Sequence, residues 1–264
     1  MRPIALFLLT VSCSFAQVPF PSAFWRTPPA TGFSFLASDS VVSRYDASDS
    51  TSITKSSQRV SQWSDLSGNS KHMTDAATGS QPYLTYNSQN GLPGIYFDGT
   101  RPDSLTCSFV SIIYQRLTVF VVVKMDASTA AYGRVIGIGN LAHDPDFASD
   151  QNACVILRDG ATDGFTAYRN LPLSTTAVTT GAANVIVSKF DGTNHTMYRD
   201  GTGSSPVASA GTFNSTVLRT GATVNYVGGG STVTIYEVVV CRTAIGDTRR
   251  AEIESHLKTK WGTP

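Results

Sequence analysis

The sequence predicts an all-β sandwich or barrel that ends in one short α-helix. About a dozen short runs rich in Val, Ile, Thr, Tyr and Phe alternate with clusters of Asp, Asn, Gly and Ser, as in strands joined by turns. One of these runs, residues 117–125, is almost continuously apolar, which is typical of a strand buried on both faces. After Gly246 the apolar spacing changes to that of a helix.

The length and hydrophobic content fit one globular domain, and the net charge argues against nucleic acid and anionic lipid as partners. A chain of 264 residues is within the range of a single large β-sandwich, and 41% hydrophobic residues argue against disorder. The net charge is only +1, so no strong electrostatic field favours nucleic acid or anionic lipid. We therefore expect no nucleic-acid partner.

The first residues predict export. Met1 and Arg2 give a short basic start, residues 4–11 are apolar except for Thr10, and 14–16 supply the small residues that signal peptidase reads. Residues 1–16 are therefore expected to be a signal peptide cleaved after Ala16, which places the protein outside the cell or on its surface. No other segment is a candidate membrane span, because residues 117–125 have only the length of a strand.

Residues 17–36 predict an extended arm or linker before a domain at 37–264. Four prolines are interleaved with Phe and Trp side chains, and proline prevents a regular hydrogen-bond ladder. The aromatic side chains are expected to lie against another surface. That surface is either the arm's own domain or a neighbouring subunit.

Runs of strand-forming residues bounded by turn residues predict where the strands of the domain lie. Strands are expected at residues 41–45, 58–63, 83–86, 94–97, 104–109, 117–125, 135–139, 154–158, 165–169, 224–227 and 232–242. Residues 184–201 predict a hairpin, because Asp191-Gly192 tolerates the positive φ that a tight turn requires. After loss of the signal peptide, Cys107, Cys154 and Cys241 remain, and each is expected to be a small buried hydrophobe.

The chain end predicts a helix over residues 247–261 that docks on the sandwich. Asp247 is a candidate N-cap, Ile253, Leu257 and Trp261 form one apolar stripe, and Gly262 ends the helix. Four basic side chains are expected on the opposite, solvated face: Arg249, Arg250, Lys258 and Lys260.

Several phrases occur in an order that resembles a known family. They are "VSQWSDLSGNSKH" (60–72), "NGLPGIYFDGT" (90–100), "FDGTNHTMYRDG" (190–201), "IYEVVVCRTAI" (235–245) and "IESHLKTKWG" (253–262). The set resembles the LamG-like jelly roll of the concanavalin A-like lectin/glucanase superfamily, in its secreted bacterial and phage form, over residues 38–262. The resemblance implies two curved antiparallel sheets with ligand roles in loops on the concave side. Its structural signature corresponds here to Trp63, Asp65, Gly68, Asn69, Phe97, Asp98, Gly99 and Trp261.

The stretch "QWSDLSGN" (62–69) has two interpretations. Its aromatic, carboxylate and amide side chains are those of a ligand-binding loop. In the structural interpretation Trp63 anchors the core, while Asp65 accepts hydrogen bonds from backbone amides of the turn that follows. We expect the structural role.

The family's catalytic motif is absent, and we expect no enzyme. Glucanases of the superfamily share a strand with the motif Glu-x-Asp-x-x-Glu. Glutamate occurs here only at Glu237, Glu252 and Glu254. Glu237 is alone in an apolar strand. Neither Gly-x-Ser-x-Gly nor His-Glu-x-x-His is present. Paired aspartates in a cleft are the alternative that would support an unusual glycan hydrolase.

Two groups of side chains are candidate sites. Residues 143–152 offer oxygen ligands suited to calcium, namely Asp144, Asp146, Asp150 and Asn152, so calcium is the one candidate cofactor. The alternative is that this acidic loop is a solvated turn. Aromatic platforms for a sugar are expected among Tyr132, His143, Tyr168, Tyr198 and Tyr226.

The combined expectation is an exported, non-catalytic binding or adhesion module that recognises carbohydrate or a surface protein. One alternative is a structural subunit of a virion, such as a decoration or tail-associated protein, or of a surface assembly built through residues 17–36. The other alternative is an atypical glycan-active hydrolase.

Overall fold

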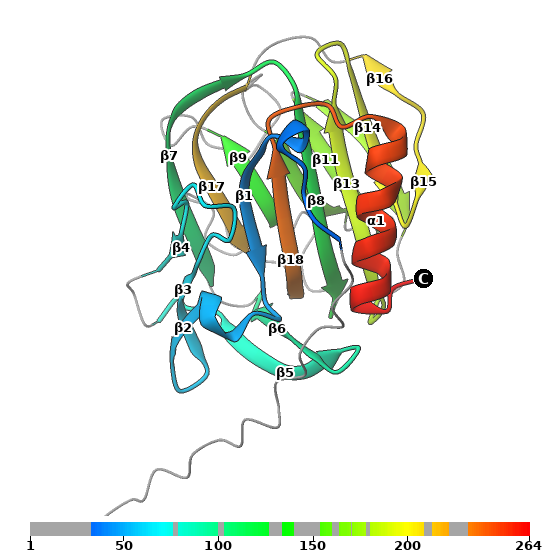
Figure 1. Ribbon diagram of the computed structural model, residues 1–264. Helices are drawn as coiled ribbons and strands as arrows, with labels where there is room; N and C mark the ends of the chain where they lie inside the picture. The colour runs from blue at the N-terminus through cyan, green and yellow to red at the C-terminus, as the bar shows by residue number, and fades with distance from the viewer. Residues whose placement is uncertain are drawn as a thin grey trace, which may run out of the picture.

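The computed structural model (Figure 1) describes residues 33–75, 79–99, 103–126, 134–139, 154–159, 164–169, 171–177, 180–208, 213–221 and 232–264. The expected signal peptide, residues 17–32 of the expected arm and the expected strand at 224–227 lie outside these residues. Among the described residues, no helix has the length and apolar character needed to cross a membrane.

Strands dominate the described chain. In order they are β1 (Val41–Asp46), β2 (Ile53–Ser56), β3 (Arg59–Trp63), β4 (Met73–Thr74), β5 (Tyr83–Gln89), β6 (Leu92–Phe97), β7 (Ser104–Tyr114), β8 (Leu117–Met125), β9 (Arg134–Gly139), β10 (Cys154–Asp159), β11 (Gly164–Arg169), β12 (Leu171–Ala177), β13 (Ala183–Phe190), β14 (Asn194–Arg199), β15 (Thr202–Gly203), β16 (Val207–Ala208), β17 (Phe213–Gly221) and β18 (Val233–Cys241). Two short 3-10 turns, η2 (Ala37–Asp39) and η3 (Ser50–Ser52), flank β1, and one helix, α1 (Asp247–Trp261), follows β18.

The strands form two antiparallel layers. The front layer runs β1–β18–β8–β13–β14, and the back layer runs β7–β17–β9–β10–β11–β12. Strands β3 to β6 continue the hydrogen-bond ladder from β18 around to β7. The expected all-β antiparallel sandwich with a C-terminal helix is therefore confirmed.

The front layer is covered on both faces. Figure 1 shows α1 lying in front of the β8–β13 region, while the back layer closes the opposite side. Every residue of β18 is buried, and β8 is buried except at Lys124. This explains the continuous apolar sequence of 117–125, because neither face of that strand meets water.

Helix α1 docks through the expected stripe. Ile253, Leu257 and Trp261 are completely buried, and Gly262 ends the helix in the left-handed region at φ 62°. The expected N-cap is wrong: Gly246 is the N-cap, and Asp247 is the first helical residue. The Asp247 carboxylate instead accepts a hydrogen bond of 2.8 Å from Lys189 Nζ on β13.

Several strands were not expected from the sequence: β2, β4, β12, β15, β16 and β17. Three of them contain only two residues, too few to show a period of two. The strand β17, "FNSTVLRTG", is largely polar in its first half. Pairing with both β7 and β9 holds it in the extended conformation. The same pairing extends β7 to Tyr114, beyond the expected end at 109. Tertiary pairing, which local propensity does not reveal, determines these elements.

Candidate functional site

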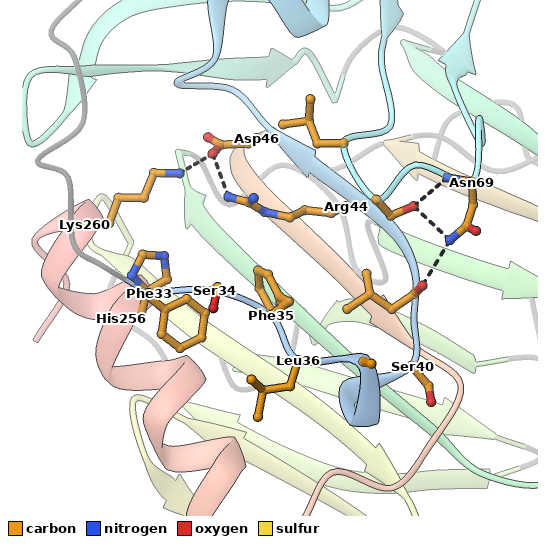
Figure 2. A pocket seen from close by; sticks show the side chains of 14 residues that line it. Phe33, Ser34, Phe35, Leu36, Ser40, Arg44, Asp46, Asn69, His256 and Lys260 are labelled. Atoms are coloured by element: carbon orange, nitrogen blue, oxygen red, sulfur yellow. Dashed lines mark hydrogen bonds and ion pairs between the residues drawn. The ribbon is translucent and has the colours of Figure 1, made fainter.

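A pocket of about 750 Å³ opens where four parts of the chain meet (Figure 2). These parts are the segment 33–37 before η2, the strand β1, the loop after β3, and the last turns of α1. The lining residues are Phe33, Ser34, Phe35, Leu36, Ala37, Ser40, Val41, Arg44, Asp46, Leu66, Ser67, Asn69, His256 and Lys260. Apolar side chains form much of its walls, whereas Arg44, Asp46 and Lys260 place charge on its floor.

The floor is built on a pair of carboxylates from neighbouring strands. Asp46 at the end of β1 is directly opposite Glu237 in β18. Lys260, from the last turn of α1, donates from Nζ to Glu237 Oε2 at 2.6 Å and also to Asp46 Oδ2. The indole Nε1 of Trp261 donates to the same Glu237 oxygen at 3.0 Å. One ammonium therefore joins the two carboxylates and fixes the helix end to the sheet.

Arg44 completes this ionic cluster from the pocket side. Its Nε donates to Glu237 Oε1 at 3.0 Å, and its Nη2 donates to Asp46 Oδ2 at 3.1 Å. The remaining nitrogen, Nη1, has no hydrogen-bond partner among the described residues. Because the Arg44 side chain is 26% exposed, it is the member of the cluster most open to the pocket.

The four charges of the cluster compensate one another. Burial alone would raise the pKa of Glu237, but Lys260 and Arg44 outweigh it and lower that pKa. Burial, followed by the neighbouring Glu237 charge, raises the pKa of Asp46. Two cations and two carboxylates thus share one buried network whose net charge is zero, and hydrogen bonds hold each member in place.

Residues 33–36 form an aromatic wall held against α1. The Phe33 ring stacks on His256 with centroids 4.2 Å apart and planes 7° apart, and Phe35 meets Phe33 edge-on at 5.3 Å. Arg249 fixes this segment from the helix, because it bonds the Ser34 carbonyl and the Asp39 carboxylate, each at 2.8 Å. In Figure 2 the segment runs from the helix, where Phe33 lies beside His256, to Leu36, below the Arg44–Asp46–Lys260 cluster.

The opposite wall is the loop that contains "QWSDLSGN". The Asp65 carboxylate accepts hydrogen bonds from the backbone amides of Arg44, Ser67 and Lys71, at 2.9, 2.9 and 3.0 Å. The Asn69 amide donates to the carbonyls of residues 41 and 42. Asp65 and Asn69 thus anchor the loop to β1, and the loop in turn presents Leu66 to the pocket.

The other signature residues divide between the core and the turns. Trp63, Phe97 and Trp261 are buried, and Gly68 has a left-handed φ of 87° at the turn. The backbone amides of Asp98 and Gly99 donate to Asp103 Oδ2 and Thr232 Oγ1, both at 3.3 Å. None of these side chains faces the pocket.

The sugar and calcium candidates lie elsewhere. Tyr132, His143, Tyr226, Asp144, Asp146, Asp150 and Asn152 are all outside the described residues. Tyr168 belongs to β11, and its side chain is outside the described part as well. Tyr198 lies on β14 beneath α1, where Arg250 covers its ring at 3.8 Å. No group of three or more His, Cys, Asp or Glu side chains able to hold a metal occurs in the described ranges.

The structure gives Glu237, the one carboxylate of its strand, three charged neighbours: Asp46, Arg44 and Lys260. One expectation about charged residues is wrong. Lys260 and Arg250 do not lie on a solvated face, since their exposed fractions are only 3% and 8%. Arg250 pairs with the buried Glu254 one turn further along α1. The signal was present in the sequence: a carboxylate inside an otherwise apolar strand requires a buried cation nearby.

The fold and pocket define a β-sandwich domain with a site at the edge of the helix-covered face. Neither family models nor curated protein sequences gave a match to the chain. Among solved structures, the binding domain of Paraclostridial Mosquitocidal Protein 1 is similar at a TM-score of 0.61 and 10% identity, over 86% of this chain and 56% of that one.

Two further structures share the fold. Domain 4 of an extracellular arabinanase from Geobacillus stearothermophilus, in complex with arabinotriose, has a TM-score of 0.57 and 13% identity, over 81% of this chain and 98% of that domain. A Trypanosoma rangeli sialidase bound to the inhibitor DANA has a TM-score of 0.56 and 12% identity, over 81% of this chain. This chain spans about a third (32%) of that sialidase and about half (56%) of the toxin domain. At these identities the likeness shows the fold.

Proposed function

We propose that this chain is an exported, non-catalytic carbohydrate-binding module of the LamG-like type, and that the pocket above β1 is its glycan site. The observation that carries the proposal is the combination of an aromatic wall, Phe33 and Phe35, with a rigid polar floor. Sugar sites pair apolar platforms for the ring faces with a few fixed hydrogen-bonding groups. A volume of about 750 Å³ is large enough for a short oligosaccharide.

The same geometry supports binding over hydrolysis. A retaining glycosidase needs one carboxylate free to attack and another free to deliver a proton. Asp46 and Glu237 meet at the floor, but both bond the same Lys260 ammonium, and Glu237 is only 1% exposed. Neither the Asp46 nor the Glu237 carboxylate is therefore free to attack a sugar carbon. Their role is to stabilise the fold and to orient Arg44.

The structural likeness adds independent support. The arabinanase domain is covered almost completely by this chain, and that domain was solved with arabinotriose. Arabinotriose is therefore the first probe to use, followed by cello-, xylo- and manno-oligosaccharides.

Isothermal titration with these sugars tests the proposal. Phe35→Ala removes the platform at a partly exposed position, and we expect it to weaken binding by about tenfold or more, as loss of one stacked ring does. Val207→Ser, at an exposed position outside the pocket, is the matched control and is expected to bind like the unaltered protein. Absence of binding to every sugar, or unchanged affinity in Phe35→Ala, would contradict the proposal.

A second candidate function is assembly with another protein. Among the described residues three large hydrophobic side chains are exposed, and two of them, Leu36 at 50% and Leu66 at 36%, line this pocket. A virion or surface-layer neighbour could cover both. Light scattering that shows a stable oligomer, lost in Leu36→Ser, would favour this function over sugar binding.

A further inference from the structure

We infer that the pocket selects uncharged glycans and rejects sugars that carry a carboxylate. This inference rests on the proposed function, because it names the class of sugar that the site takes.

The charges around the floor sum to zero. Arg44 and Lys260 contribute two cations, while Asp46 and Glu237 contribute two carboxylates within direct bonding distance of them. His256 also lines the pocket, and its burial lowers its pKa, so the ring is neutral at pH 7. Among the described residues that line the pocket, a bound carboxylate would find no cation that is not already matched.

A carboxylate would also meet direct repulsion. Asp46 itself lines the pocket, and its two oxygens lie at the same floor as the Arg44 guanidinium. A second anion beside Asp46 in a partly desolvated site is unfavourable, since like charges brought together at an interface repel each other. The network cannot easily rearrange to relieve this, because both cations are held by two carboxylates each.

The unused hydrogen-bond capacity suits neutral oxygens. Asp46 Oδ1 accepts from the amide and the hydroxyl of Ser48 at 3.0 and 2.6 Å, while Oδ2 accepts from Lys260 and Arg44. All four acceptor positions of that carboxylate are thus occupied. Arg44, the exposed member of the cluster, keeps donor capacity at Nη1, on a side chain that is 26% exposed. A sugar hydroxyl or ring oxygen accepts such a bond without adding charge.

The test compares neutral and acidic probes on the same protein. We expect arabinotriose, xylotriose or cellotriose to bind at least about tenfold tighter than 3′-sialyllactose and trigalacturonate in titration calorimetry. Raising NaCl from about 0.05 to 0.5 M should leave the affinity for the neutral sugar within about twofold, because no net charge is paired on binding.

The variant Asp46→Asn tests whether the negative charge of Asp46 causes the rejection of acidic sugars. Asp46→Asn keeps the shape of the side chain and removes one negative charge, so affinity for trigalacturonate is expected to rise by about tenfold. Asp247→Asn, at an exposed aspartate that does not line the pocket, is the matched control and should keep the original preference. Thermal melting establishes whether Asp46→Asn is folded, and the preference of the unaltered protein tests the inference independently of that variant.

The outcomes separate this inference from the proposed function. Tighter binding of acidic sugars, or equal binding of both classes, overturns the inference and leaves a glycan site in place. No binding to any sugar overturns both. A preference for neutral sugars that Asp46→Asn shifts toward acidic ones supports the inference.

Discussion

Lys260 Nζ lies 2.6 Å from Glu237 Oε2, so the last turn of α1 is tied to the middle of the front layer by a buried ion pair. The two side chains are among the most buried charges in the described chain, at 3% and 1% exposure. The pair does two things at once. It docks the helix that carries His256, and it holds the carboxylate that orients Arg44 in the pocket.

Removing the ammonium should destabilise the fold strongly. In Lys260→Met, Asp46 and Glu237 face each other with only Arg44 to compensate them, and loss of one partner of a buried ion pair costs about 3 to 5 kcal/mol. We expect a fall of that size in the free energy of unfolding, measured by urea denaturation. Lys55→Met, at an exposed lysine, is the control and should change stability by less than about 0.5 kcal/mol. Equal stabilities in the two variants would contradict the structural role of the cluster.

Arg249 is expected to control whether the aromatic wall stays closed. It bonds the Ser34 carbonyl and Asp39, and its guanidinium lies 4.9 Å from the centre of the Phe33 ring. Arg249→Gln should therefore free residues 33–39 while leaving the sandwich intact. Hydrogen–deuterium exchange is expected to rise in this segment and not in β8 or β18. Arg242→Gln, at an exposed arginine, is the control, and unchanged exchange at 33–39 in Arg249→Gln would rule out the anchoring role.

Gly94 occupies a position where only glycine fits. A Cβ placed there would lie 2.5 Å from Thr234 Cγ2 and 2.6 Å from Tyr236 Cε1, both on the neighbouring strand β18. Gly94→Ala should lower the free energy of unfolding by about 1 to 3 kcal/mol, the range of overpacking. Gly79→Ala, where nothing lies within 4 Å, is the control and should be nearly neutral. Thermal and urea unfolding of the two variants side by side measure the difference.

The sequence predicted the architecture better than the site. Strand periodicity, the apolar stripe of α1 and the turn glycines are local patterns, and each was sufficient to place its element. The pocket depends on contacts across long separations: Lys260 meets Asp46 from 214 positions away, and Arg44 meets Glu237 from 193. Periodicity cannot show such pairs. A lone glutamate in an apolar strand requires a buried cation, but the sequence spacing does not indicate which one.

Asp65 provides a test of what "QWSDLSGN" does. Its carboxylate accepts from three backbone amides and from the Ser67 hydroxyl at 2.8 Å. Asp65→Ala should lower the free energy of unfolding by about 2 to 3 kcal/mol, as loss of hydrogen bonds to a charged group does. Asp49→Ala is the matched control, because the Asp49 carboxylate accepts only local bonds, from the exposed residue Thr51. A variant with unchanged melting but lost sugar binding would instead assign the loop to ligand contact.

His256 should make stability fall on mild acidification. Burial lowers its pKa in the folded protein below the ordinary value of 6.5, whereas the unfolded chain keeps that ordinary value. The unfolded state therefore binds the proton more readily, and the stability contributed by neutral His256 is complete above pH 6.5 and is lost as the pH falls through the folded pKa.

Replacing the His256 ring removes this dependence of stability on pH. In His256→Gln the decline in unfolding free energy between about pH 7 and 5 should be shallower than in the unaltered protein, because the titrating group is gone. Urea unfolding at several pH values measures both slopes, and identical slopes would show that His256 does not titrate in this range. Because the ring stacks on Phe33, the acid-induced loss should also reach the aromatic wall, which predicts weaker sugar binding at pH 5 than at pH 7.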